Sequence, residues 1–249
     1  MKLEHCKRKK AGLYAVTFDD GRAYLFYDEI ILKYQLLYKN ELAEEELEII
    51  LKENDSFRCY YTALELLNRV VKSSKEVDGY LIKKEFSKKD REQAIVKLQK
   101  QGYLNDLAYA KSFVHDQILT TSSGPLTIKA KLLKKGISEN DFQEAIKEYD
   151  EEIEKTKIKK IVMKALKGNS NKSIAMLKRT IFQKLISDGF NKNLIELELD
   201  NLKQDDEDNI RQKQLKKIKT KLERKYSGKE LEYRIKMKMR QLGFKDMDD

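Results

Sequence analysis

The sequence predicts a mainly α protein in which tandem three-helix repeats form an elongated, curved solenoid, with a small β-hairpin at the N-terminus. The first observation behind this prediction is a short pattern that occurs four times, in which a large apolar residue is followed five positions later by a second one. The four pairs are Leu81 and Phe86, Leu132 and Ile137, Leu185 and Phe190, and Met239 and Phe244. The closing residues lie 51, 53 and 54 positions apart. A period of this size is typical of repeat proteins, in which each unit buries its apolar face against the next.

The second observation is that each pair stands where a helix ends. Gly136, Gly189 and Gly243 directly precede three of the closing residues, and glycine readily takes the left-handed conformation that ends many helices. The apolar pair then makes the contact that accompanies a Schellman motif. In the first copy Glu85 occupies the glycine position, where left-handed geometry costs a residue with a side chain about 1 kcal/mol.

The third observation is a set of helix-start signals before and after these ends. Ser73 and Ser227 each open an S-x-x-E capping box. Ser123-Gly124-Pro125 offers a polar cap with proline in the first turn, and Ser170-Asn171 can cap the third copy. After each end a further cap is available, at Ser87, Ser138 and Asn191. Each repeat is therefore expected to contain a first helix, a second helix delimited at both ends, a tight turn and a third helix.

These signals divide the chain into four repeats. The first helices are expected at 57–71, 106–120, 151–166 and 205–226. The predicted parts are a lead-in over 1–56, the first repeat over 57–103, the second over 104–150, the third over 151–204, and a fourth over 205–249 that lacks its third helix.

The lead-in has a different pattern. Residues 14–18 and 23–26 alternate in polarity on either side of Asp19-Asp20-Gly21, which predicts a β-hairpin. Helices over 28–38 and 42–52 are expected to join it to the first repeat. His5 and Cys6 are placed in a flexible terminus.

Composition agrees with a soluble helical protein. Of 249 residues, 38% are charged and one is proline. No apolar run approaches the roughly 20 residues that span a bilayer, and no apolar core follows the Lys-rich N-terminus. We expect a cytoplasmic monomer whose two cysteines stay reduced.

Positive charge is concentrated at the C-terminal end. Residues 211–245 hold fourteen Lys and Arg against three Glu, a local charge of +11, so this segment accounts for the whole of the net charge of +10. One interpretation is a solvated helix surface, and the other is contact with nucleic-acid phosphates or another acidic surface. The candidate contact residues are Lys129, Lys131, Lys134 and Lys135 in the second repeat, Lys172, Lys178, Arg179 and Lys184 in the third, and Lys216, Lys217, Lys219 and Lys221 in the fourth.

Signs of catalysis are missing from the sequence. His5 and His115 lie in no metal-ligand spacing, and the acidic residues are scattered over helix surfaces. We expect no enzyme activity, no catalytic residue, no metal and no cofactor.

Three segments resemble motifs of one known family. Leu104-Asn105-Asp106-Leu107-Ala108-Tyr109-Ala110 is similar to the L-N-D-x-x-[FY]-A signature of the bacterial RecX regulatory proteins, and Lys72-Ser73-Ser74-Lys75-Glu76-Val77 is similar to their R-[ST]-x-x-E-[LV] segment. Ser123-Gly124-Pro125 with Lys135-Gly136-Ile137 resembles their K-G-P and K-G-I. The resemblance covers the whole chain, including the extra repeat of the longer members from low-GC Gram-positive bacteria. Lys72 replaces the usual Arg and Ser123 the usual Lys, so contacts that need those side chains are not carried over.

The resemblance implies a non-enzymatic regulator of the RecA recombinase, active in DNA repair, recombination and the SOS response. Such proteins lie along the groove of the RecA filament on DNA and damp its ATP hydrolysis and strand exchange. Contact with single- or double-stranded DNA is left open. The residues themselves leave two alternatives: a DNA-binding protein of helix-turn-helix type, although the third helices are not basic, and a helical scaffold for protein partners. The signature residues suit helix starts and core positions, so they are expected to be structural.

Overall fold

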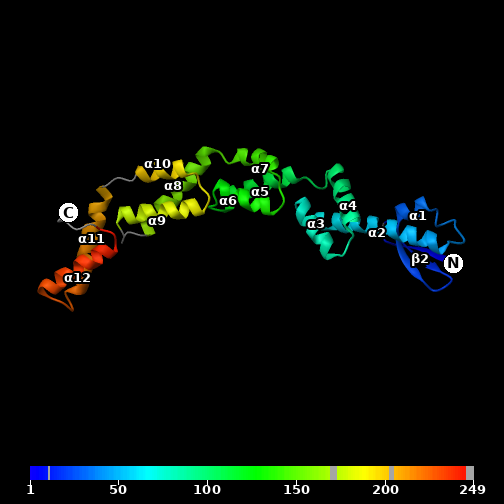
Figure 1. The fold of residues 1–249 in the computed structure, drawn as a ribbon, viewed down its shortest axis with the longest axis horizontal. Coiled ribbons are helices and arrows are strands. Elements are labelled where there is room, and N and C mark those ends of the chain that lie inside the picture. Colours follow the sequence, from blue (N-terminus) through cyan, green and yellow to red (C-terminus); the bar gives the residue numbers. More distant parts are fainter. Residues whose placement is uncertain (11, 169–172, 202–204, 245–249) are drawn as a thin grey trace. The chain divides into compact units, whose positions relative to one another are not determined.

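The computed structural model describes residues 1–10, 12–168, 173–201 and 205–244, in which a small antiparallel sheet is followed by helices (Figure 1). The predicted fold class, mainly α with a small N-terminal β element, is confirmed. The chain forms two compact units. One comprises Met1–Tyr109 with Lys135–Ser138, and the other comprises Ala110–Lys134 with Glu139–Asp249.

The N-terminal sheet has three strands where a two-stranded hairpin was predicted. Strands β2 (Leu13–Phe18) and β3 (Ala23–Tyr27) are the expected hairpin, and β1 (Leu3–Lys10) pairs with β2 on its other side. His5 and Cys6 lie on β1, so their expected place in a flexible terminus is wrong. The strand was missed because charged side chains occur on both of its faces, as is common on an edge strand, and of its described side chains only Leu3 and Cys6 pack against the core.

Behind the sheet, α1 (Asp28–Lys33) is followed by α2 (Glu44–Leu67), a single helix of 24 residues. Two helices were predicted here, with a break before residue 57, and that break is wrong. The polar stretch that suggested it contains Asn54, whose side-chain amide donates to the Leu25 carbonyl (2.9 Å) and accepts from the Tyr27 N–H (3.1 Å). Because the sheet satisfies this buried amide, the helix continues through it.

The remaining helices follow the predicted order of the repeats. Their bounds are α3 (Ser74–Lys83) and α4 (Lys88–Lys100), α5 (Asp106–Thr120), α6 (Pro125–Lys134) and α7 (Glu139–Ala145, extended by the 3-10 turn η1, Ile146–Glu148), α8 (Glu151–Gly168), α9 (Ile174–Ser187) and α10 (Lys192–Asp200), and α11 (Asp205–Leu222) and α12 (Gly228–Gln241).

All four predicted helix ends are confirmed. The φ angles are 62° at Glu85, 83° at Gly136, and 84° at both Gly189 and Gly243. In three copies the N–H of the closing residue donates to the carbonyl five residues earlier, as a Schellman motif requires. These bonds run from Phe86 to Leu81 (3.3 Å), from Phe190 to Leu185 (3.1 Å) and from Phe244 to Met239 (3.1 Å). In the remaining copy, the apolar pair Leu132 and Ile137 is buried.

The helix starts agree with the prediction in part. Ser73 forms the full capping box with Glu76, and Ser87 and Asn191 cap α4 and α10. The capping box predicted at Ser227 is wrong, because that side chain makes no cap hydrogen bond and Gly228 has a φ of 58°. Ser170-Asn171 lies outside the described residues, and the cap of α9 is Ser173.

Three second helices, α3, α6 and α9, each have their start hydrogen-bonded to the turn that closes the second helix of the following repeat. The bonds join Ser73 Oγ to the Lys135 carbonyl (2.7 Å), the Gly124 N–H to the Asp188 carbonyl (2.8 Å), and the Ser173 N–H to the Leu242 carbonyl (2.8 Å). The amides and carbonyls that helix ends leave unpaired are thereby satisfied in part by one another.

Position 189 requires glycine for two reasons. One is its φ of 84°. The other is space, because a Cβ at this position would lie 2.6 Å from Oγ1 of Thr127 and still nearer to the backbone nitrogen of that residue. The sequence pattern predicted only the first reason.

Candidate nucleic-acid interface

The fourth repeat is a helical hairpin with a basic surface. Only narrow apolar stripes on α11 and α12 face inward, and they bury Leu222, Met239 and, beyond α12, Phe244. Every Lys and Arg from Lys213 to Arg240 is exposed. The packing of the hairpin therefore leaves its positive side chains in water.

Two hollows open on this hairpin. The first, which we call the tyrosine hollow, lies between α11 and α12 and has a volume of about 490 Å³. It is lined by Lys221, Leu222, Lys225, Tyr226, Tyr233, Arg234, Met237, Lys238 and Gln241. The second, the lysine hollow, has a volume of about 730 Å³ and runs along α11. It is lined by Lys213, Gln214, Lys216, Lys217, Thr220, Lys221 and Arg224. Lys221 borders both hollows.

Within the tyrosine hollow the two aromatic rings differ in their surroundings. The guanidinium carbon of Arg234 lies 4.1 Å from the centroid of the Tyr226 ring, and Arg234 Nε also donates to Glu230 (3.1 Å). Tyr233 is 64% exposed. The hairpin thus presents one ring already covered by a cation and a second ring facing solvent.

The candidate residues predicted in the fourth repeat lie together. Lys216, Lys217 and Lys221 line the lysine hollow, and Lys219 is exposed on the same helix, 3.8 Å from the carboxylate of Glu223. Such a solvated pair leaves most of the field of a lysine available.

The cluster predicted in the second repeat is mostly engaged inside the protein. Lys129 pairs with Glu139 (2.6 Å), Lys131 donates to Gln117 (2.8 Å) and Lys135 pairs with Glu76 (2.9 Å). Lys134 is exposed. In the third repeat Arg179 and Lys184 are exposed on α9 and Lys178 is half-buried, whereas Lys172 lies outside the described residues.

Comparison with known proteins adds an independent line of evidence. A family model described as the second three-helix domain of RecX matches residues 105–146. The regulatory protein RecX of Oceanobacillus iheyensis is 28% identical over 95% of this chain and 89% of its own length. RecX of Listeria monocytogenes serotype 4b (strain F2365) is 30% identical over 88% of this chain and 82% of its own length.

The chain belongs to the RecX family.

Solved structures of the family share its fold. A crystal structure of regulatory protein RecX has a TM-score of 0.73 to this chain and is 24% identical, covering 80% of this chain and 99% of its own. The structure of RecX from Lactobacillus salivarius has a TM-score of 0.58 and 28% identity, over 60% of this chain and 97% of its own.

Residues from each of the three RecX-like segments, with Lys135 from the third, meet at one junction in the first compact unit. Ser73 Oγ donates to the Lys135 carbonyl (2.7 Å), the Ser74 N–H donates to Asp106 (2.8 Å), and Lys135 Nζ lies 5.6 Å from the centroid of the Tyr109 ring. These contacts join residues of the first and second repeats. These contacts are consistent with the structural role that we expected for the signature residues.

Glu76 is the centre of this junction. Burial on its own would raise the pKa of its carboxyl, but hydrogen bonds from Lys135, the Ser73 N–H and Tyr109 together outweigh burial and lower the pKa to about 2. Lys72 adds a weaker contact at 3.3 Å. The charge of Lys135 is thus matched inside the protein by Glu76.

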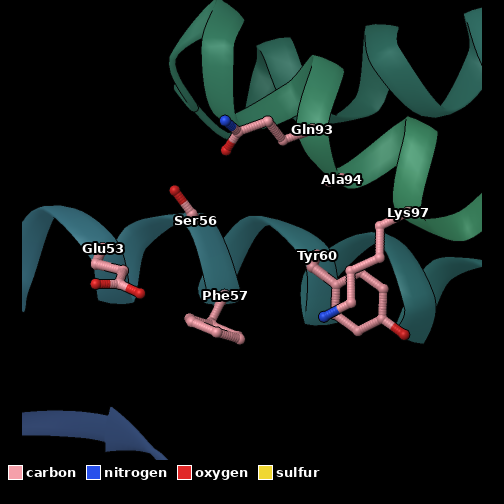
Figure 2. A pocket seen from close by; sticks show the side chains of 7 residues that line it. All are labelled: Glu53, Ser56, Phe57, Tyr60, Gln93, Ala94 and Lys97. Atoms are coloured by element: carbon pink, nitrogen blue, oxygen red, sulfur yellow. The ribbon is translucent and has the colours of Figure 1, made fainter. Parts of the chain in front are cut away.

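A further hollow of about 250 Å³ lies between α2 and α4 (Figure 2). Phe57 and Tyr60 from α2 form one wall, and the Lys97 ammonium from α4 lies 4.1 Å from the centroid of the Tyr60 ring. Glu53 at its edge is paired with Lys33 (2.6 Å). The lining contains neither histidine nor cysteine, and the hydroxyl of its Ser56 donates to the carboxylate of Asp90.

Among the described residues, no group of three His, Cys, Asp or Glu side chains is placed to hold a metal ion. In the same part of the chain, no helix is both long and apolar enough to cross a bilayer.

Charge counting found the lysines of α11 but missed Tyr226, Tyr233 and Arg234. Their signal was present in the sequence, since Tyr226 stands directly before the Ser227-Gly228 turn and the other two follow within eight residues. Only the folded hairpin places the turn and the second helix around one hollow.

Proposed function

We propose that this protein binds the filament that the RecA recombinase forms on DNA, and that it slows ATP hydrolysis and strand exchange without chemistry of its own. The observation that carries the proposal is similarity to RecX regulatory proteins over 95% of the chain. The match extends through the repeats and is not confined to one short motif. It therefore supports a shared mode of action.

Surface charge supports the same proposal. A RecA filament on DNA presents a polyanion to its partners, and clustered exposed cations are attracted to it over a distance set by salt. The fourth repeat provides such cations, because its lysines and arginines from Lys213 to Arg240 are exposed. We infer that this repeat contributes more of the attraction than the second, where three of the four candidate lysines have protein partners.

The test measures ATP turnover by RecA on single-stranded DNA, at two salt concentrations, with parent and variant. Reversal of Lys216, Lys217, Lys219 and Lys221 to Glu should reduce inhibition and reduce its sensitivity to salt. The matched control reverses Lys83, Lys84, Lys88 and Lys89, four exposed lysines of the first repeat. It makes the same change in net charge at another place.

Four results are informative. Loss of inhibition in the first variant alone supports the proposal. Equal loss in both variants means that only net charge matters, and retained inhibition in both removes the fourth repeat from the binding surface. Failure of the parent protein to inhibit RecA overturns the proposed function itself.

A further inference from the structure

The tyrosine hollow combines two features that a purely electrostatic surface does not need. Lys221, Lys225 and Lys238 stand around it, and the exposed ring of Tyr233 lies in its wall with Met237 beside it in the same lining. A surface that used only charge would gain nothing from an exposed aromatic ring. Tyr233 is 64% exposed in a cationic hollow. This combination favours a ligand that carries both phosphates and a flat apolar group.

Unpaired nucleotides are such a ligand. Proteins that bind single strands combine a positively charged groove along the backbone with aromatic rings on which bases stack. In a duplex the bases are already stacked on one another and paired, so their faces are not offered to a protein ring. The ring of Tyr233 therefore favours a single strand over a duplex.

The lysine hollow supplies the path of the backbone. It meets the tyrosine hollow at Lys221, and it adds four other basic side chains along α11, Lys213, Lys216, Lys217 and Arg224. Side chains one turn apart on a helix lie on the same face about 5–6 Å apart, which is similar to the distance between successive phosphates of an extended strand. The two hollows together form a continuous cationic surface with an aromatic ring at one end.

We propose that the α11–α12 hairpin binds single-stranded nucleic acid directly, with a base stacked on Tyr233 and the phosphates along the lysine hollow. This proposal rests on the proposed function and makes it more specific, because it names the single DNA strand as the ligand of the hairpin. The binding itself requires no recombinase, so the two can fail separately.

The experiment uses the full chain without RecA and a fluorescein-labelled single-stranded oligonucleotide of mixed sequence, with binding followed by fluorescence anisotropy. The competitors are the unlabelled single strand, unlabelled duplex of the same sequence, and heparin, which is a polyanion without bases. The variants are Tyr233→Ala and Tyr233→Phe, and the matched control is Tyr103→Ala, at another exposed tyrosine, in the first repeat. Circular dichroism checks that each variant is folded.

Tyr233→Ala should weaken binding of the single strand by about 5- to 150-fold, the range found when a stacking ring is removed. Its salt dependence should stay unchanged, because the same cations still neutralise the phosphates. Tyr233→Phe and Tyr103→Ala should bind like the parent. Replacement of Lys217 and Lys221 by Ala should instead reduce the salt slope, by about 0.7 for each phosphate that is no longer neutralised.

Some outcomes would overturn the inference. If Tyr233→Ala binds the single strand as tightly as the parent does, the ring takes no part. If heparin or duplex competes as well as the unlabelled single strand, attraction to any polyanion explains the binding. A protein that passes this test but fails to inhibit RecA would keep the DNA site and lose the proposed function.

Discussion

Replacement of Gly189 by Ala tests the docking between the second and third repeats. The methyl group would be strained by the φ of 84°, at a cost of about 1–2 kcal/mol. It would also meet Thr127 Oγ1 at 2.6 Å, so α6 would have to move away. That movement weakens two backbone hydrogen bonds, from Gly124 to Asp188 and from Leu126 to Gly189, each contributing about 0.5–1.5 kcal/mol. The expected loss is therefore about 2–5 kcal/mol in total.

Gly102 provides a matched control. It has a φ of 77° and ends α4 with the same Schellman bonds, but a Cβ there would meet nothing within 4 Å. Gly102→Ala should therefore lower the free energy of unfolding only by the cost of the left-handed conformation, about 1–2 kcal/mol. Urea denaturation followed by circular dichroism compares the two variants with the parent. Equal destabilisation by the two substitutions would show that the close approach at Gly189 has no energetic weight, and the reasoning on end-to-end docking would be refuted.

Three further predictions concern single side chains. The folded-state pKa of Glu76, about 2, lies below its ordinary value of 4.5, so the stabilisation from its ionised form is complete above about pH 4.5 and is lost as pH falls toward 2. It amounts to at most about 3 kcal/mol, and the stability difference between the parent and Glu76→Gln should shrink between pH 6 and pH 3 in urea titrations. Ser73→Ala should destabilise by about 1–3 kcal/mol and Ser87→Ala by about 1 kcal/mol, because Ser73 also donates to Lys135; equal melting temperatures would contradict this. Burial raises the pKa of Cys59 to about 12, so a thiol reagent at pH 8 should modify Cys6 first, and faster labelling of Cys59 would show that the first repeat opens.

Local signals were readable from the sequence. The helix ends at Glu85, Gly136, Gly189 and Gly243, and the caps at Ser73, Ser87 and Asn191, involve residues within five positions of one another. Such signals depend on backbone geometry and on hydrogen bonds within one turn, which are the same wherever the segment lies in the fold. The concentration of lysines in the fourth repeat was likewise a property of composition alone.

Tertiary structure decided the features that join distant residues. Asn54 keeps α2 continuous because strand β3 lies close enough to satisfy its amide, and β1 becomes a strand because β2 offers it an edge. Lys135 looked like a free surface charge in the sequence, but its partner Glu76 is 59 positions away. The tyrosine hollow similarly exists only when α12 folds back on α11. A charge or ring has the same local pattern whether it is paired or exposed, and only packing determines which partner, if any, comes within reach.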